Sequence, residues 1–214
     1  MHFNDHSLLA GKHALLSASK YHWIRYAPED IAEAYKNGFA QEIGTSLHSL
    51  ARNMIRHRVK MTRNDKRMIM LHLLSDGIPR NVFDVDMYFP NLMAYINDAI
   101  GFGMVPETIL YYSENCFGTA DAINPLQSIL KNRFLRIHDL KTGRTPAHME
   151  QLQIYAALFC LEYKCSPLEM ETELRIYQGD EPAVLLPDPH DILEISDKII
   201  AGDKVLKDMK AQGE

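Results

Sequence analysis

Residues Arg133 to Lys141 read Arg-Phe-Leu-Arg-Ile-His-Asp-Leu-Lys and are followed by Thr-Gly. Branched and aromatic residues are enriched in this run, and the Thr-Gly pair stops it, which is the pattern of a β-strand. Successive side chains on a strand point to opposite faces. The stretch therefore predicts that Asp139 and Lys141 share one face near the end of a strand, while Leu140 points to the other.

Asp139 and Lys141 suit phosphodiester chemistry that depends on a metal ion. A carboxylate binds hard cations such as Mg²⁺ or Mn²⁺. A neighbouring lysine can hold a water molecule or neutralise charge that develops on a phosphate. A surface strand with one Asp and one Lys is also common, so this pair alone equally fits a solvated face.

Gly118-Thr119-Ala120-Asp121 supplies a second carboxylate. We expect a strand here, paired with the strand at Arg133 to Lys141 through a loop from Asn124 to Lys131. Small residues allow a backbone or ligand to approach closely. Asp121 would then face Asp139, and two such carboxylates repel each other unless a cation lies between them. The alternative is a turn aspartate.

Two helices are expected to bring further polar side chains. Ala147 to Tyr163 has helical periodicity, and Gln151 and Tyr155 share one face of it. Gly44 to Arg58 is the second helix, with His48 beside its apolar stripe. A neutral imidazole can join oxygen ligands on Mn²⁺. Tyr155 also fits the edge of a core, and a lone helical histidine is more often a packed or surface residue.

In order, the motifs Gly44…His48, Gly118…Asp121, Asp139…Lys141-Thr142-Gly143 and Gln151…Tyr155 resemble those of the PD-(D/E)XK nuclease superfamily. The resemblance is to its RecB-like branch, which includes many phage recombination exonucleases. Residues 16–23, Leu-Ser-Ala-Ser-Lys-Tyr-His-Trp, are similar to the amino-terminal Ser-x-Ser segment of phage members. The resemblance covers residues 14 to 178.

The resemblance implies an α/β fold with a restriction-endonuclease-like core, in which helices flank a small central mixed sheet. It implies a catalytic set of Lys141, Asp121, Asp139 and Gln151. The implied metal ligands are His48, Asp121, Asp139 and the carbonyl of Leu140. Glu107 is implied as a further metal ligand, because it stands where such families often carry a glutamate on the first core strand. A solvent-facing strand glutamate is the alternative for Glu107.

The function implied by the resemblance is a DNA exonuclease that uses Mg²⁺ or Mn²⁺, with two ions, in phage or bacterial recombination or repair. Some relatives hold an iron–sulfur cluster on four cysteines. Cys116, Cys160 and Cys165 lack that pattern, so no cluster is expected. Besides DNA, a single-strand annealing or recombination protein is an implied partner. Polarity and oligomeric state stay open, although some related phage exonucleases form rings around DNA. The alternatives are a structure-specific or restriction-type endonuclease, or an inactive nucleic-acid-binding protein of the same fold.

Composition is that of one globular domain. The chain has 214 residues, of which 46% are hydrophobic and 24% charged. We expect one domain over 1–214, with a helical part at 1–103, the core sheet and the Gln151 helix at 104–178, and a terminal helix at 189–214. No apolar run reaches transmembrane length, and Met1 to His6 lacks the pattern of a signal peptide. These features and three scattered cysteines indicate a cytoplasmic protein without membrane association.

Charge is unevenly distributed. The net charge is −5, which argues mildly against nucleic-acid binding. One short segment is nevertheless strongly basic, and with Tyr155 it is the expected DNA-binding surface. It contains Arg52, Arg56, Arg58, Lys60, Arg63, Lys66 and Arg67. A solvated helix pair explains such a run equally well. Most of the acidic excess falls between Glu169 and Asp197.

The remaining pattern predicts where the other elements lie. Further helices are expected at 19–26, 31–37, 65–74, 90–101 and 191–209. Strands are expected at 104–114, 117–123 and 170–177, with turns at 113–116 and 178–182. The order strand, strand, strand, helix, strand in the middle of the chain favours helices packed around a small mixed sheet.

Overall fold

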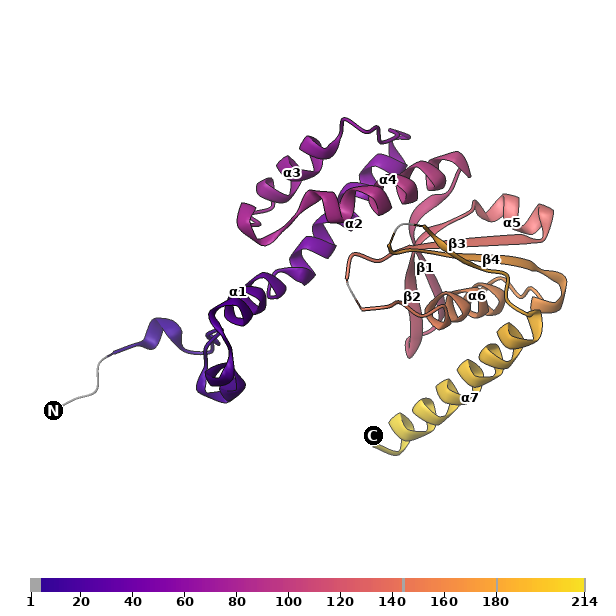
Figure 1. Cartoon of the computed structure of the whole chain (residues 1–214). Coiled ribbons are helices and arrows are strands. Elements are labelled where there is room, and N and C mark those ends of the chain that lie inside the picture. Colours follow the sequence, from indigo (N-terminus) through magenta and orange to yellow (C-terminus); the bar gives the residue numbers. More distant parts are fainter. Residues whose placement is uncertain (1–4, 144, 180, 214) are drawn as a thin grey trace.

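The computed structural model describes residues 5–143, 145–179 and 181–213. A helical part precedes a sheet with its own helices (Figure 1). The helical part contains short 3₁₀ helices at Ser7–Leu9, Ala18–Arg25 and Arg80–Val82, and α1 (Pro28–Asn37), α2 (Ala40–Arg56), α3 (Lys66–Ser75) and α4 (Val85–Gly101). The second part contains β1 (Val105–Ser113), β2 (Cys116–Ile123), α5 (Leu126–Asn132), β3 (Phe134–Leu140), α6 (Glu150–Glu162), a 3₁₀ turn (Pro167–Glu169), β4 (Glu171–Tyr177), β5 (Ala183–Leu185) and α7 (Pro189–Gly213).

The five strands form one mixed sheet in the order β1-β2-β3-β4-β5. β3 and β4 are parallel, and the other neighbouring pairs are antiparallel. A parallel pair needs a crossover connection, and α6 provides it between β3 and β4. Helices cover both faces of the sheet, so the expected α/β class with a flanked mixed sheet is confirmed (Figure 1).

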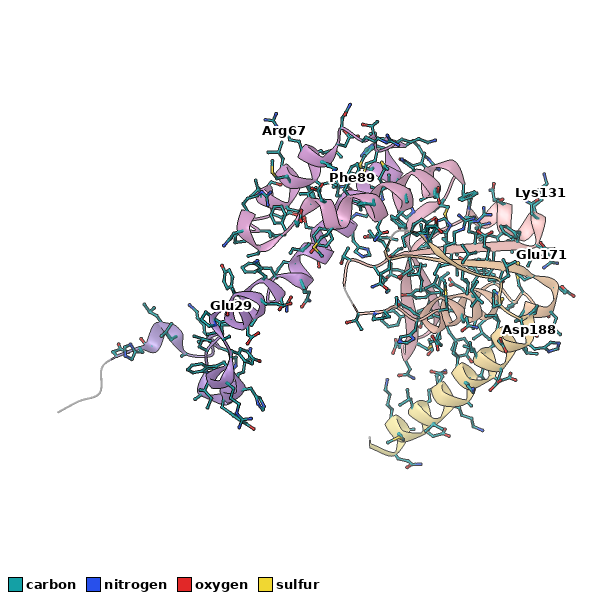
Figure 2. All side chains as sticks on the ribbon, viewed as in Figure 1. Glu29, Arg67, Phe89, Lys131, Glu171 and Asp188 are labelled. Atoms are coloured by element: carbon teal, nitrogen blue, oxygen red, sulfur yellow. The ribbon has the colours of Figure 1, made fainter. Side chains whose placement is uncertain are left out.

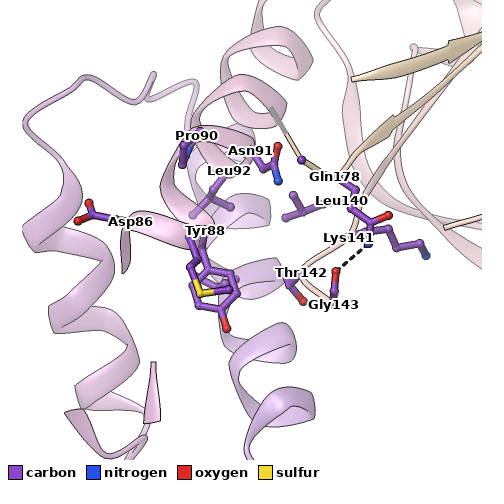
Figure 3. A pocket seen from close by; sticks show the side chains of 13 residues that line it. Asp86, Tyr88, Pro90, Asn91, Leu92, Leu140, Lys141, Thr142, Gly143 and Gln178 are labelled. Carbon is purple, nitrogen blue, oxygen red and sulfur yellow. Dashed lines mark hydrogen bonds between the residues drawn. The ribbon is translucent and has the colours of Figure 1, made fainter. Parts of the chain in front are cut away.

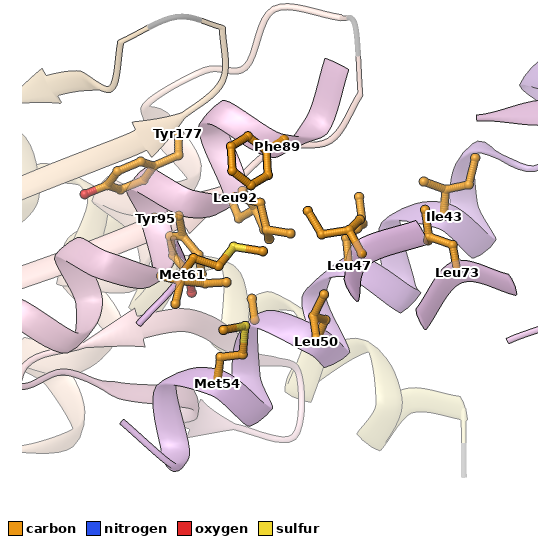
Figure 4. Close-up of a cluster of buried hydrophobic side chains, with 14 of the residues drawn as sticks. Ile43, Leu47, Leu50, Met54, Met61, Leu73, Phe89, Leu92, Tyr95 and Tyr177 are labelled. Carbon is orange, nitrogen blue, oxygen red and sulfur yellow. The ribbon is translucent and has the colours of Figure 1, made fainter. Parts of the chain in front are cut away.

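One hydrophobic cluster joins the helical part to the sheet (Figure 4). Buried residues of α2 recur at helical spacing, as in Ile43, Leu47, Leu50 and Met54, and form the stripe that faces α3 and α4. Ala122, Leu140 and Tyr177 extend this cluster onto the sheet. The packing fixes α2, and with it His48, beside β1, while α4 lies on β3 and β4.

A second cluster covers the opposite face of the sheet. Leu152, Ala156 and Phe159 of α6 pack there against strand residues such as Leu135 and Ile137, and Ile192 of α7 joins them. Among the described residues, none before Ile43 is buried, and the segment 5–39 extends away from the body (Figures 1 and 2). The two clusters therefore hold the sheet between α2–α4 on one side and α6–α7 on the other.

Several boundaries differ from the sequence prediction. Residues 124–131 were expected to form a loop, but α5 occupies Leu126–Asn132. Arg133 was placed in the third strand, yet it adopts a left-handed conformation (φ 53°) at the C-cap of α5. β5 was not predicted. α4 begins at Val85, not at Pro90, because the Asp84 carboxylate accepts a hydrogen bond from the Asp86 N–H and caps the first turn.

The other predicted elements agree within a few residues at their ends. The segment near 19–26 is a 3₁₀ helix, and residues 114–115 turn between β1 and β2. Asp180, within the predicted turn, and Met1 to Asn4 lie outside the described residues. None of the helices in the described ranges is long and apolar enough to cross a membrane.

Candidate functional site

The end of β3 presents Asp139 and Lys141 on one face, as predicted. Leu140, between them, points the other way into the cluster with α2 and α4. Lys141 Nζ donates to Asp139 Oδ1 at 3.2 Å and lies 3.0 Å from Oδ2. The ammonium is thus held beside the buried carboxylate, as the alternation of strand side chains requires.

Asp121 lies opposite Asp139. Ala122 pairs with His138 in the antiparallel register of β2 and β3, so the next pair brings the two aspartates to the same level. Asp121 Oδ2 accepts a hydrogen bond from the Leu140 N–H at 2.8 Å. This contact fixes Asp121 to the strand that carries Asp139, so the expected pairing of the two carboxylates is confirmed.

Asp139 is buried with one oxygen unsatisfied. The residue is 3% exposed, and Oδ2 has no hydrogen-bond partner among the described residues because the nearby ammonium is not aligned with it. Burial, and then the charge of Asp121, raise the pKa of Asp139 from 3.8 to about 6, although Lys141 opposes this. Asp139 is therefore ion-paired with Lys141, but among the described residues its buried Oδ2 receives no hydrogen bond.

His48 reaches the same carboxylates from α2. Its Nδ1 lies 3.5 Å from Asp121 Oδ2, and its side chain is partly exposed. Burial disfavours protonation of His48, but the hydrogen bond and charge of Asp121, with the charge of Asp139, outweigh it and raise the pKa of the imidazole. His48 is therefore drawn into the site by negative charge, and it is not simply a packed helical residue.

A chain of hydrogen bonds connects Lys141 to α6. Lys141 Nζ donates to Gln151 Oε1 at 2.8 Å, and Gln151 Nε2 donates to the Tyr155 hydroxyl at 3.1 Å. A Cβ added to Gly118 would lie 2.7 Å from Tyr155 Cε1, so only glycine admits this ring against β2. The expectation that Gln151 and Tyr155 look into the site is confirmed.

Glu107 completes a row of three acids across β1, β2 and β3. The pairs on either side of it in the register place it opposite Asp121, and its backbone is left-handed (φ 49°). Arg52 Nη1 donates to Glu107 Oε2 at 2.8 Å. Glu107 is thus ion-paired in this structure and is not a fully solvent-facing glutamate.

An open cleft of about 540 Å³ runs between α2 and the sheet at this site. A Cβ on Gly44 would lie 3.0 Å from Thr142 Oγ1, so glycine lets α2 approach the loop after β3. The lining residues are Ala40, Gln41, Gly44, Thr45, His48, Ser49, Arg52, Glu107 and Thr142. Gly44 and Thr142 are therefore parts of the site wall.

A second cleft of about 400 Å³ lies between α4 and the Thr142–Gly143 loop (Figure 3). Tyr88, Leu140 and Gln178 are among its lining residues. Gln178 donates a hydrogen bond to the Gly143 carbonyl, which Figure 3 shows as a dashed line. Sequence reasoning missed Gln178, because no local pattern reports a contact between residues this far apart in the chain.

The basic segment is only partly at the site. Arg52 lines the cleft, whereas Arg56, Arg58, Lys60 and Arg63 are exposed at and beyond the end of α2. Lys66 pairs with Asp86, and the exposed Arg67 lies on the side of α3 turned away from the sheet (Figure 2). Of this basic segment, only Arg52 is therefore among the residues that line the cleft.

The site offers oxygen and nitrogen donor atoms to a metal ion. No three His, Cys, Asp or Glu side chains within the described ranges gather closely enough to form a metal-binding group. Asp121, Asp139 and His48 still offer oxygen and nitrogen donors, and the unpartnered buried Oδ2 of Asp139 is an atom that a cation would satisfy. These donor atoms are of the types that a hard divalent cation takes as ligands.

No family model, curated protein or solved structure matches this chain. The interpretation of the site consequently depends on its own geometry.

Proposed function

We propose that the protein is a metal-dependent deoxyribonuclease with a PD-(D/E)XK, restriction-endonuclease-like core of the RecB-like branch. Lys141 carries this proposal, because its Nζ lies between Asp139 and Gln151 while Asp121 faces Asp139 across the strand pair. An ammonium fixed beside two carboxylates at the end of a strand suits hydrolysis of a phosphodiester.

In this proposal Asp121, Asp139, His48 and the Leu140 carbonyl hold Mg²⁺ or Mn²⁺. Such a cation neutralises phosphate charge and makes water more acidic. Lys141 then donates a hydrogen bond to the attacking water or to a phosphate oxygen. Gln151 keeps the ammonium in place, and Tyr155 keeps Gln151 in place. Glu107 contributes through Arg52, whose guanidinium it orients at the mouth of the cleft.

DNA is the proposed substrate, and exonucleolytic cleavage from an end is the proposed mode. Arg52 at the cleft, and Arg56, Arg58, Lys60 and Arg63 beyond it, supply positive charge for a phosphate backbone despite the net charge of −5. A catalytically inactive DNA-binding protein of the same fold is the second candidate.

One experiment separates these functions. Linear and covalently closed circular duplex DNA are incubated with the wild-type protein and with Lys141→Ala, with and without Mn²⁺. Loss of the linear substrate alone, only with Mn²⁺ and wild-type Lys141, supports the exonuclease. Cleavage of the circle indicates an endonuclease. DNA binding without cleavage of either substrate would refute the proposed activity and favour the inactive binder.

A further inference from the structure

The loop between β3 and α6 connects the two parts of the site that carry Lys141 and Gln151. Lys141 ends the strand side of the site, and Gln151 lies in the first turn of α6. Among the described residues 141–149, none belongs to a helix or a strand. The 2.8 Å bond between Lys141 Nζ and Gln151 Oε1 therefore depends on how this irregular loop is held.

Gln178 holds three peptide groups of that loop. It is the first residue after β4, whose end lies beside the end of β3, because the Lys141 N–H donates to the Tyr177 carbonyl at 3.0 Å. Gln178 Nε2 donates to the carbonyls of Gly143 at 2.7 Å and Thr145 at 2.8 Å. Its Oε1 accepts from the Ala147 N–H at 2.9 Å. Both amide donors and the amide acceptor are thus used within one loop.

We propose that Gln178 is a positioning residue that clamps Gly143, Thr145 and Ala147 and thereby sets α6, and with it Gln151, against Lys141. This inference rests on the proposed nuclease function and deepens it. A side-chain amide is suited to this place, because one group both donates to two carbonyls and accepts from one N–H. Within the described residues, the hydrogen bonds of Gln178 go to loop peptide groups and not to Lys141, Gln151 or the two aspartates.

Two substitutions at Gln178 dissect the clamp, and one substitution elsewhere controls for it. Gln178→Met keeps the length of the side chain and removes all three hydrogen bonds. Gln178→Glu keeps the acceptor and, when ionised, brings a carboxylate against two carbonyl oxygens. Gln127→Glu makes the same chemical change at an exposed position of α5. All three variants retain Lys141 and Gln151.

The first readout needs no catalysis. We expect hydrogen exchange at the Ala147 amide to accelerate in Gln178→Met, and the side-chain amide signal of Gln151 to shift in NMR spectra of both Gln178 variants. Gln127→Glu should change neither. Unchanged exchange at Ala147 in Gln178→Met, or an unchanged Gln151 signal in both Gln178 variants, would overturn the clamp whether or not the protein cleaves DNA.

The second readout asks which kinetic constant changes, kcat or KM. We expect kcat to fall about 10- to 100-fold in both Gln178 variants, because small displacements of a positioned group cost rates of that order. KM for DNA should stay near the wild-type value. A wild-type kcat combined with faster exchange at Ala147 would show that the clamp orders the loop without positioning Lys141, and would overturn the inference. If the wild-type protein cleaves nothing, the proposed function fails, and the NMR signal of Gln151 still decides the clamp.

Discussion

β3 and β4 carry two polar clusters, one on each face, and among the described residues of these strands only one cluster leaves a carboxylate oxygen without a hydrogen bond. On the face toward α4, Glu173 Oε1 accepts from Arg136 Nε and Arg175 Nε, each at 2.7 Å. Tyr177 donates to Asp98 at 2.8 Å, and the Phe102 ring lies 3.8 Å from the Arg136 guanidinium carbon. On the opposite face, Asp139 has a buried oxygen without a hydrogen bond.

Charge explains the difference between the two clusters. Two guanidiniums meet Glu173 and Asp98 on the α4 face, and although burial opposes it, the guanidiniums lower the pKa of Glu173. His138 Nε2 in this cluster also lacks a partner, but burial and then Arg175 and Arg136 lower the pKa of His138 to about 3, so the ring is neutral. Burying an atom without a hydrogen bond costs less free energy when it belongs to a neutral group than when it belongs to a charged group. The paired cluster attaches α4 to the sheet, whereas the cluster around Asp139 is suited to receive a ligand.

Lys141→Ala should produce the largest effect of all on the second cluster. It removes the only described ammonium that bonds both Asp139 and Gln151, and we expect turnover to fall about 10²- to 10³-fold. The protein should still fold and bind DNA, with a lower melting temperature because the buried Asp139 loses its ion-pair partner. Lys141→Arg should not restore the rate, because a planar fork does not replace a compact ammonium. Single-turnover cleavage assays measure this, and near-wild-type rates in Lys141→Ala would exclude the assigned role.

Breaking the paired cluster on the α4 face should lower stability and leave kcat unchanged. Glu173→Gln leaves two partly buried guanidiniums without their shared anion, and breaking such a pair costs on the order of 3 kcal/mol. We expect unfolding at lower urea concentration, with kcat retained in the folded protein. A large loss of kcat without a loss of stability would show that the two faces are not separable as proposed.

Asp139→Asn should stabilise the metal-free protein. The folded pKa of Asp139, about 6, is above its ordinary value of 3.8. The folded state therefore binds more protons than the unfolded state between pH 4 and 6, and stability falls as pH rises through that window. At about 1.4 kcal/mol per pKa unit, the variant gains up to about 3 kcal/mol above pH 6, less the lost contact with Lys141.

Thermal melts at several pH values test this prediction. The melting temperature of Asp139→Asn minus that of the wild type should rise from pH 4 to pH 6 and then level off. Added Mn²⁺ should reduce the difference, because it stabilises only the wild type. A difference that does not depend on pH would mean that Asp139 is already compensated in the folded protein.

Local periodicity explains which parts of this arrangement the sequence could predict. Strand alternation placed Asp139 and Lys141 on one face, and helical spacing placed Gln151 beside Tyr155. Given these orientations, the hydrogen bond between Gln151 and Lys141 requires only that α6 lies beside the end of β3. Neighbouring residues in one element carry their relative orientation with them, which is why this half of the site was predictable.

The parts that were missed depend on contacts between distant segments. β5 is three residues long and exists through pairing with β4, as in Leu174 with Leu185. Arg52 meets Glu107, and Gln178 meets Gly143, across long stretches of chain. α5 is a short helix that Pro125 precedes, and the proline was interpreted as part of a loop. No local periodicity encodes such pairings.

His48→Ala should change the protein less than Lys141→Ala or Asp139→Asn does. The reason is that the imidazole is partly exposed and lies at the edge of the site. We expect activity to fall about 10-fold in limiting Mn²⁺ and to recover in excess metal, as loss of one ligand predicts. Protons compete with metal at His48, and the negative charge around the imidazole raises its pKa, so the Mn²⁺ affinity of the wild type should fall as the imidazole gains its proton. In His48→Ala, the pH dependence of Mn²⁺ affinity should come only from protonation of Asp139, near pH 6. An unchanged Mn²⁺ titration with a lower melting temperature would make His48 a packing residue.

Neutralising Arg56, Arg58 and Arg63 together should have the smallest effect, because these exposed residues lie outside the row of acids. Each phosphate contact that is lost removes about 0.9 from the slope of log affinity against log salt for duplex DNA. We expect weaker binding, a flatter slope and unchanged turnover at saturating DNA.

Lys131, on α5, is a matched control, because Lys131→Gln removes an exposed charge beside the opposite end of the sheet. If the triple variant and Lys131→Gln give the same slope per charge, general charge determines DNA affinity. If the triple variant alone flattens the slope, the DNA path leaves the cleft at Arg52 and continues beyond the end of α2.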